Sequence, residues 1–89
     1  PLIAAQRDVL TADLTALGLT VCPSQANYLL FRGPAGLDTA LLRQKIAIRS
    51  CVNYPGLGEG WYRTAVRLPE ENEALLDALR RGMEELSWR

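Results

Sequence analysis

The sequence has no histidine, only one lysine and only two cysteines, and each scarcity argues against a class of chemistry. General acid–base catalysis usually needs histidine or a tuned carboxylate or lysine, and no serine or cysteine has a histidine to activate it. Cys22 and Cys51 form no CxxC pair and have no histidine beside them, which excludes a zinc site. We interpret them as free thiols in a reducing cytosol, where disulfides are rare. Independent catalysis by this chain is not expected.

Long hydrophobic runs and net charge are also missing. No apolar run approaches the roughly 20 residues of a membrane span, and no basic segment precedes an apolar one as in a signal peptide. Ten basic residues, nine of them arginine, balance ten acidic ones. No general field therefore draws the chain to nucleic acid or to a membrane. We predict a cytoplasmic protein with neither partner.

The length of 89 residues suits one domain with a modest core. The chain begins at Pro1, not at a methionine, directly before a helical pattern. From this we expect it to be part of a longer polypeptide.

The spacing of apolar residues predicts seven elements. Helical spacing of Ile3, Leu10 and Leu14 predicts a helix over 2–17, with Gly18 as its C-terminal stop. A last helix begins at Pro69, and its expected core stripe is Leu75, Leu76, Leu79, Met83 and Leu86. Strands are predicted over 19–21, 27–32, 46–49 and 61–67, with a turn at 23–25 and a short helix over 39–45.

We expect Asp38 to cap that short helix and Leu37 to form a hydrophobic staple with Leu42. The order α-β-β-α-β-β-α predicts an α+β fold, in which helices pack on one face of a small, largely antiparallel sheet.

The most informative stretch is 46–67, IAIRSCVNYPGLGEGWYRTAVR, which sets Arg49 and Arg63 on neighbouring strands. Alternation along the second strand puts Tyr62, Thr64 and Val66 on one face, and Arg63, Ala65 and Arg67 on the other. Each guanidinium offers a planar fork that matches carboxylate or phosphate. The pattern predicts an anion clamp that faces water or another domain across a cleft.

Simpler interpretations remain open at this point. Arg49 and Arg63 could be solvated or paired with an acid such as Glu59, and Arg67 could pair with Glu70 or Glu71. Asn27 is either a hydrogen-bonding partner of the Pro23-Ser24 turn or a substrate-binding residue of the cleft. The glycines at 56, 58 and 60 form no phosphate cradle, because no helix begins directly after them. Loop flexibility explains them better.

The stretches VCPSQANYLLFR, IAIRSCVNYPGLGEGWYRTAVR and PEENEALLDAL, in this order, resemble the C-terminal small domain of fold-type I pyridoxal-phosphate enzymes. The resemblance spans essentially the whole chain. Within these enzymes it is similar to the branch of histidinol-phosphate aminotransferase and threonine-phosphate decarboxylase. It favours the decarboxylases, because the aminotransferases more usually carry an acidic residue where Ser50 stands and a glycine where Arg67 stands.

The resemblance implies that residues 1–89 form one small domain that works with a large pyridoxal-phosphate-binding domain of the same polypeptide, in a homodimeric enzyme. Arg63 matches the arginine that binds the substrate α-carboxylate, and in the aminotransferase branch this position helps to hold the phosphate. Arg49 matches the arginine that helps to bind the substrate phosphate. The Schiff-base lysine belongs to the large domain, and Lys45 does not match it. We therefore expect pyridoxal phosphate in the full-length enzyme and none on this chain alone.

The function implied is substrate binding in a threonine-phosphate decarboxylase, which converts threonine O-3-phosphate to aminopropanol phosphate in cobalamin synthesis. The alternative is the same domain of a histidinol-phosphate aminotransferase. An alternative of another class is a stand-alone binding module for small phosphorylated metabolites, and a third interpretation leaves both arginines merely solvated. The sequence upstream of Pro1 would discriminate the module from a domain of a larger enzyme.

Overall fold

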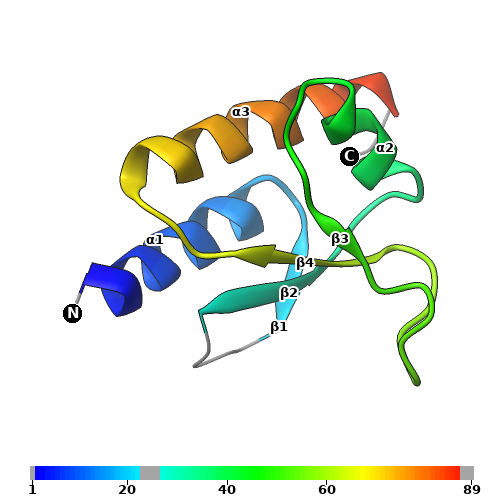
Figure 1. Ribbon diagram of the computed structural model, residues 1–89, viewed down its shortest axis with the longest axis horizontal. Coiled ribbons are helices and arrows are strands. Elements are labelled where there is room, and N and C mark those ends of the chain that lie inside the picture. Colours follow the sequence, from blue (N-terminus) through cyan, green and yellow to red (C-terminus); the bar gives the residue numbers. More distant parts are fainter. Residues whose placement is uncertain (1, 23–26, 87–89) are drawn as a thin grey trace.

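The computed structural model describes residues 2–22 and 27–86, and its elements follow in the predicted order α-β-β-α-β-β-α (Figure 1). The elements are α1 (Leu2–Ala16), β1 (Thr20–Cys22), β2 (Tyr28–Arg32), α2 (Leu37–Leu42), β3 (Arg49–Ser50), β4 (Trp61–Ala65) and α3 (Pro69–Glu85). None of the helices in these ranges is long and apolar enough to cross a bilayer.

The four strands form one sheet in the order β1-β2-β4-β3, and every neighbouring pair is antiparallel. The register aligns Cys22 with Leu30, Leu30 with Arg63, and Arg63 with Arg49, so these four residues form one row across the sheet. The predicted α+β fold with a small antiparallel sheet is confirmed. The strand that carries Arg63 is central, and the strand that carries Arg49 is at the edge.

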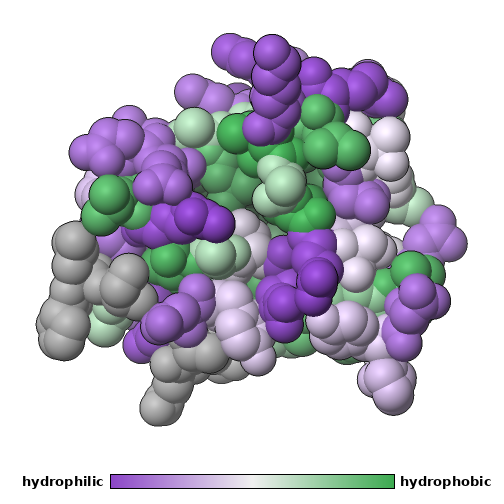
Figure 2. Space-filling model, viewed as in Figure 1, coloured by the Kyte–Doolittle hydropathy of each residue, from purple (hydrophilic) through white to green (hydrophobic). Residues whose placement is uncertain are grey.

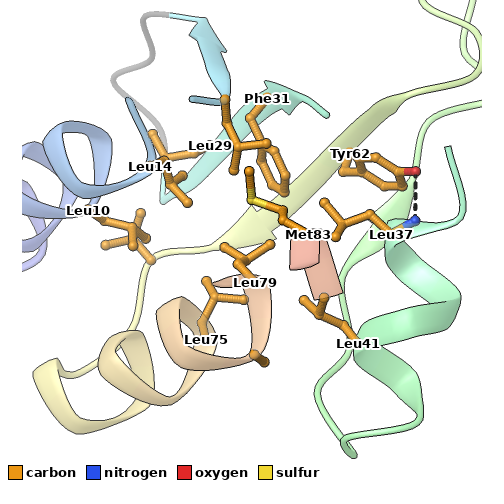
Figure 3. Close-up of a cluster of buried hydrophobic side chains, with 13 residues drawn as sticks. Leu10, Leu14, Leu29, Phe31, Leu37, Leu41, Tyr62, Leu75, Leu79 and Met83 are labelled. Atoms are coloured by element: carbon orange, nitrogen blue, oxygen red, sulfur yellow. Dashed lines mark hydrogen bonds between the residues drawn. The ribbon is translucent and has the colours of Figure 1, made fainter. Parts of the chain in front are cut away.

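The hydrophobic core lies between one face of this sheet and the helices α1, α2 and α3 (Figure 3). The sheet contributes alternate residues, including Leu29, Phe31 and Tyr62, because side chains along a strand point to opposite faces. The predicted stripe of α3 is confirmed: Leu75, Leu79 and Met83 are buried, and its other two leucines pack against the core. Removal of this apolar surface from water is the main force that holds the helices to the sheet.

Two helices end with the same backbone motif. After α1, the N–H of Leu19 donates to Leu14 O (3.2 Å) and the N–H of Gly18 donates to Thr15 O (3.0 Å). After α2, Ile46 donates to Leu41 O (3.0 Å) and Lys45 donates to Leu42 O (2.9 Å). Both are Schellman motifs, which need a residue with positive φ. That residue is Gly18 (φ 93°) in the first helix and Lys45 (φ 63°) in the second.

The prediction for the start of α2 was wrong. The helix begins at Leu37, its N-cap is Gly36 with φ 87°, and Asp38 lies within the first turn. The Leu37 N–H instead donates to the hydroxyl of Tyr62 (3.2 Å), which reaches it from β4 and itself donates to Pro34 O (2.7 Å). The staple is also wrong, because Leu37 is fully buried while Leu42 is 65% exposed.

The bounds of the strands differ from the prediction, most clearly at β3. In place of the predicted strand over 46–49, the structure has a two-residue strand, Arg49–Ser50, while Ile46 and Ile48 precede it and pack against the core. β4 ends at Ala65, after which Val66 N–H donates one more bond to Asn27 O (2.8 Å). β1 begins one residue later than expected. The turn predicted at 23–25 lies outside the described residues.

Candidate functional site

The sheet face opposite the core carries an open depression of about 580 Å³ beside β3 and β4. Its lining residues are Asn27, Tyr28, Ala47, Ile48, Arg49, Arg63, Thr64, Ala65 and Arg67. The structure therefore brings together all three predicted site residues, Arg49, Arg63 and Asn27. Figure 2 shows hydrophilic side chains over the region where β3 and β4 meet, with a hydrophobic area between them and α3.

Arg49 and Arg63 are direct cross-strand partners on this face. Like charges directly opposite each other on a sheet are destabilising, so an anion bound between them would relieve the repulsion. Within 2–22 and 27–86, no carboxylate oxygen lies within 4.0 Å of either guanidinium, and the ion pair with Glu59 is not formed. Arg63 is partly buried and Arg49 is exposed, which leaves both accessible to a ligand.

Tyr28 restrains Arg63. The Cζ atom of Arg63 lies 5.0 Å from the centre of the Tyr28 ring, a cation–π contact worth about 0.5–1 kcal/mol at an exposed position. Tyr28 is the cross-strand partner of Ala65, so this is a diagonal contact between β2 and β4. Sequence reasoning missed this contact, because it predicted a strand over 27–32 without the register between β2 and β4.

Arg67 lines the same depression and also forms the predicted pair with an acid of α3. Its Nη1 atom lies 3.6 Å from Oε2 of Glu71, and both side chains are at least half exposed. Exposed pairs of this kind contribute about 0–1 kcal/mol. The interaction is therefore too weak to prevent Arg67 from binding another anion.

The backbone of Arg67 is held by Asn72, a buried residue of α3. The Arg67 N–H donates to Asn72 Oδ1 (3.1 Å), and Asn72 Nδ2 donates to Arg67 O (2.9 Å) and to Gln6 Oε1 (3.2 Å). These bonds fix the turn from β4 into α3. Sequence reasoning missed Asn72, although an asparagine near a helix start, where its side chain competes for nearby backbone groups, was a usable signal.

Asn27 extends the sheet with its backbone carbonyl and also lines the depression. Its carbonyl accepts the Val66 N–H at 2.8 Å, while the residue itself is exposed and lines the depression. Its position is compatible with the predicted binding role, which stays a prediction. A bond to the Pro23-Ser24 turn would involve residues outside those described.

Lys45 and the cysteines do not line the depression that holds Arg49, Arg63 and Arg67. Lys45 is exposed at the end of α2 and lines a second hollow of about 260 Å³, which shares Arg67 with the first. Cys22 and Cys51 are free thiols associated with the two opposite edge strands. The described part of the chain contains no cluster of three or more His, Cys, Asp or Glu side chains placed to hold a metal ion.

The comparison with known families decides the assignment. The model of the family "Aminotransferase class I and II" matches residues 2–79. The chain belongs to the aminotransferase class I and II family. The antiparallel sheet with helices on one face and the row of arginines on the other are therefore features of a member of this family.

Individual relatives carry two different names. A threonine-phosphate decarboxylase of Salmonella typhimurium is 54% identical over 65 residues, which cover 70% of this chain and 18% of that protein. A histidinol-phosphate aminotransferase of Streptomyces avermitilis is 38% identical over 78 residues, which cover 88% of this chain and 21% of that protein. The chain thus spans about a fifth of the length of these curated relatives.

Among solved structures, the histidinol-phosphate aminotransferase of Clostridium acetobutylicum matches with a TM-score of 0.85 at 29% identity. The match covers 93% of this chain and 27% of that one. The relatives carry the names of two enzymes, a decarboxylase and an aminotransferase, and the comparisons do not decide between these two reactions.

Proposed function

We propose that this chain is the substrate-binding C-terminal domain of a pyridoxal-phosphate-dependent threonine-phosphate decarboxylase. The full-length enzyme would convert threonine O-3-phosphate to aminopropanol phosphate in cobalamin synthesis. The observation that carries the proposal is the row of Arg49 and Arg63, which face each other in the depression without a carboxylate partner among the described residues. The 54% identity to a protein named for that activity favours this reaction.

Arg63 is the proposed ligand of the substrate carboxylate. It stands on β4, which is paired on both sides, and its guanidinium is stacked on Tyr28. Both restraints reduce the conformational entropy that Arg63 would lose on binding. Arg49, on the edge strand, is the proposed ligand of the phosphate, and the Asn27 side chain flanks the same depression as a further hydrogen-bonding group.

The described residues do not fit pyridoxal phosphate itself. The cofactor needs an amine for covalent attachment, and the single lysine, Lys45, is exposed at the end of α2 and does not line the depression. We therefore propose that a large domain of the same polypeptide holds the cofactor, in a cytoplasmic homodimer. The contribution of this chain is to bind and orient the substrate.

A histidinol-phosphate aminotransferase is the second candidate. The TM-score of 0.85 to an enzyme of that name favours it. In that case Arg63 would help to hold the substrate phosphate, and the depression would accept a substrate with an imidazole ring instead of threonine phosphate.

The test uses the full-length enzyme with threonine O-3-phosphate and histidinol phosphate as competing substrates. We expect decarboxylation of the former, and activity toward imidazole substrates alone would refute the assignment. We expect Arg63→Ala to weaken substrate affinity by roughly tenfold to a hundredfold, the contribution of a charge-assisted hydrogen bond. Arg80→Ala, at an exposed position of α3 outside the depression, is the control. Unchanged affinity and rate for Arg63→Ala would contradict the clamp.

A further inference from the structure

We propose that Arg67 is a third anion ligand of the depression and makes it selective for phosphate esters over their unphosphorylated counterparts. The inference rests on the proposed function, because it concerns the same depression. Neither the prediction nor the family resemblance gave Arg67 a role in binding.

The charge around the depression supports this role. Its lining contains Arg49, Arg63 and Arg67 and no acidic side chain. A phosphate monoester carries about −1.5 to −2 charges near neutral pH, and a carboxylate adds about one more. Three guanidinium groups provide one partner for the carboxylate and two for the doubly charged phosphate, whereas Arg49 and Arg63 alone leave the phosphate with a single arginine.

The position of Arg67 also supports it. Arg63, Ala65 and Arg67 share one face of β4 and its extension, so the small Ala65 lies between two arginines. The Arg63 guanidinium lies over the ring of Tyr28, whose cross-strand partner is Ala65. A ligand above Ala65 would lie between two arginine positions of the same face.

The backbone of Arg67 is preorganised for this task. Asn72 engages both its N–H (3.1 Å) and its carbonyl (2.9 Å) and is itself bonded to Gln6 on α1. Asn72 is 5% exposed, so these bonds are protected from competition by water. The Arg67 side chain remains 64% exposed, and its ion pair with Glu71, at 3.6 Å, is the only one it forms within residues 2–22 and 27–86. A phosphate could displace Glu71 at little cost.

The experiment measures binding of inorganic phosphate to the full-length enzyme by calorimetry, together with affinity for threonine O-3-phosphate and threonine. We expect Arg67→Gln to weaken phosphate binding about tenfold, as for one lost charge-assisted contact, and to leave threonine affinity unchanged. Arg67→Lys keeps the charge without the planar fork and should therefore lose less phosphate affinity than Arg67→Gln. Glu71→Gln removes the competing carboxylate and should strengthen phosphate binding about two- to threefold.

The matched control is Arg80→Gln, because Arg80 pairs with Asp77 at 2.9 Å on the same helix, is similarly exposed, and does not line the depression. If Arg67→Gln and Arg80→Gln bind phosphate equally well, the inference is wrong. If Arg49→Ala weakens phosphate binding while Arg67→Gln does not, only this inference fails. If Arg49→Ala, Arg63→Ala and Arg67→Gln all bind phosphate normally, the proposed function fails with it.

Discussion

The buried hydroxyl of Tyr62 connects β4 with the turn that precedes α2. It donates to Pro34 O at 2.7 Å and accepts the Leu37 N–H at 3.2 Å, while its ring contacts Phe31 in the core with a centroid separation of 5.7 Å. Burial raises the pKa of Tyr62, since it disfavours the charged phenolate. The side chain therefore both packs and caps a helix.

For Tyr62→Phe we expect a loss of about 1–2 kcal/mol in the free energy of unfolding near neutral pH, because the ring is kept while two hydrogen bonds are lost. The native tyrosine stabilises the fold fully below its unfolded pKa of about 10, and this contribution is lost as the pH rises through the raised folded pKa. The difference in the free energy of unfolding between wild type and Tyr62→Phe should therefore shrink above about pH 10, as measured by urea unfolding. A difference that stays constant with pH would contradict this account.

Single residues of the site were predictable to the extent that alternation along one strand defines them. The alternation around Arg63 correctly separated the buried face, with Tyr62, Thr64 and Val66, from the more exposed face that carries the arginines. It could not predict that Tyr28 meets Arg63, because that contact depends on the register between β2 and β4. The roles of Arg49, Arg63 and Asn27 in binding remain predictions.

At the scale of elements, the ends of α1 and α2 place different residues in the same strained conformation. Gly18 adopts its positive φ without steric cost, whereas the Cβ atom of Lys45 meets the backbone at φ 63°. The second helix end therefore carries a local cost that the first avoids. Lys45 is exposed, so a substitution there changes little besides the backbone.

We expect Lys45→Gly to raise the free energy of unfolding by about 0.5–1 kcal/mol, because removal of a left-handed penalty of about 1–2 kcal/mol exceeds the entropic cost of glycine, about 0.5–1 kcal/mol. The melting temperature would rise by about 4–8 °C for each kcal/mol in a chain of this size. Gly18→Ala should shift it in the opposite direction, and Lys45→Ala should leave it nearly unchanged. If Lys45→Ala stabilises as much as Lys45→Gly, the removed charge and not the backbone is responsible.

The elements themselves were predictable because their periodicity is local, but their boundaries were not. The start of α2 depends on the Tyr62 hydroxyl, which comes from a distant strand. The short β3 follows a segment whose backbone is still engaged in the Schellman motif at Lys45 and Ile46, a tertiary detail that apolar periodicity does not report. The glycines at 56, 58 and 60 all have positive φ, so they have a defined conformational role that the flexibility interpretation did not include.

At the scale of the whole molecule, the proposed function assigns anion recognition to this chain and cofactor attachment to another domain. We expect the 89-residue chain to show no saturable spectroscopic change when titrated with pyridoxal phosphate, and no turnover of threonine O-3-phosphate. The reason is that the one lysine lies outside the depression that the arginines line. The full-length enzyme is the positive control. Tight uptake by the chain that Lys45→Ala abolishes would show that the lysine can serve as the attachment point.

The position of β3 at the sheet edge has a consequence for how the site can adapt. Detachment of β3 from the sheet breaks only its two residue pairs with β4, whereas β4 is paired with β2 on one side and with β3 on the other. Local fluctuations follow the elements of lowest stability. Under the proposed roles, the carboxylate ligand is on the element that opens least and the phosphate ligand on the one that opens most readily. Evolution could therefore retune the distance between the two anions by small shifts of one edge, leaving the core and the central strands untouched.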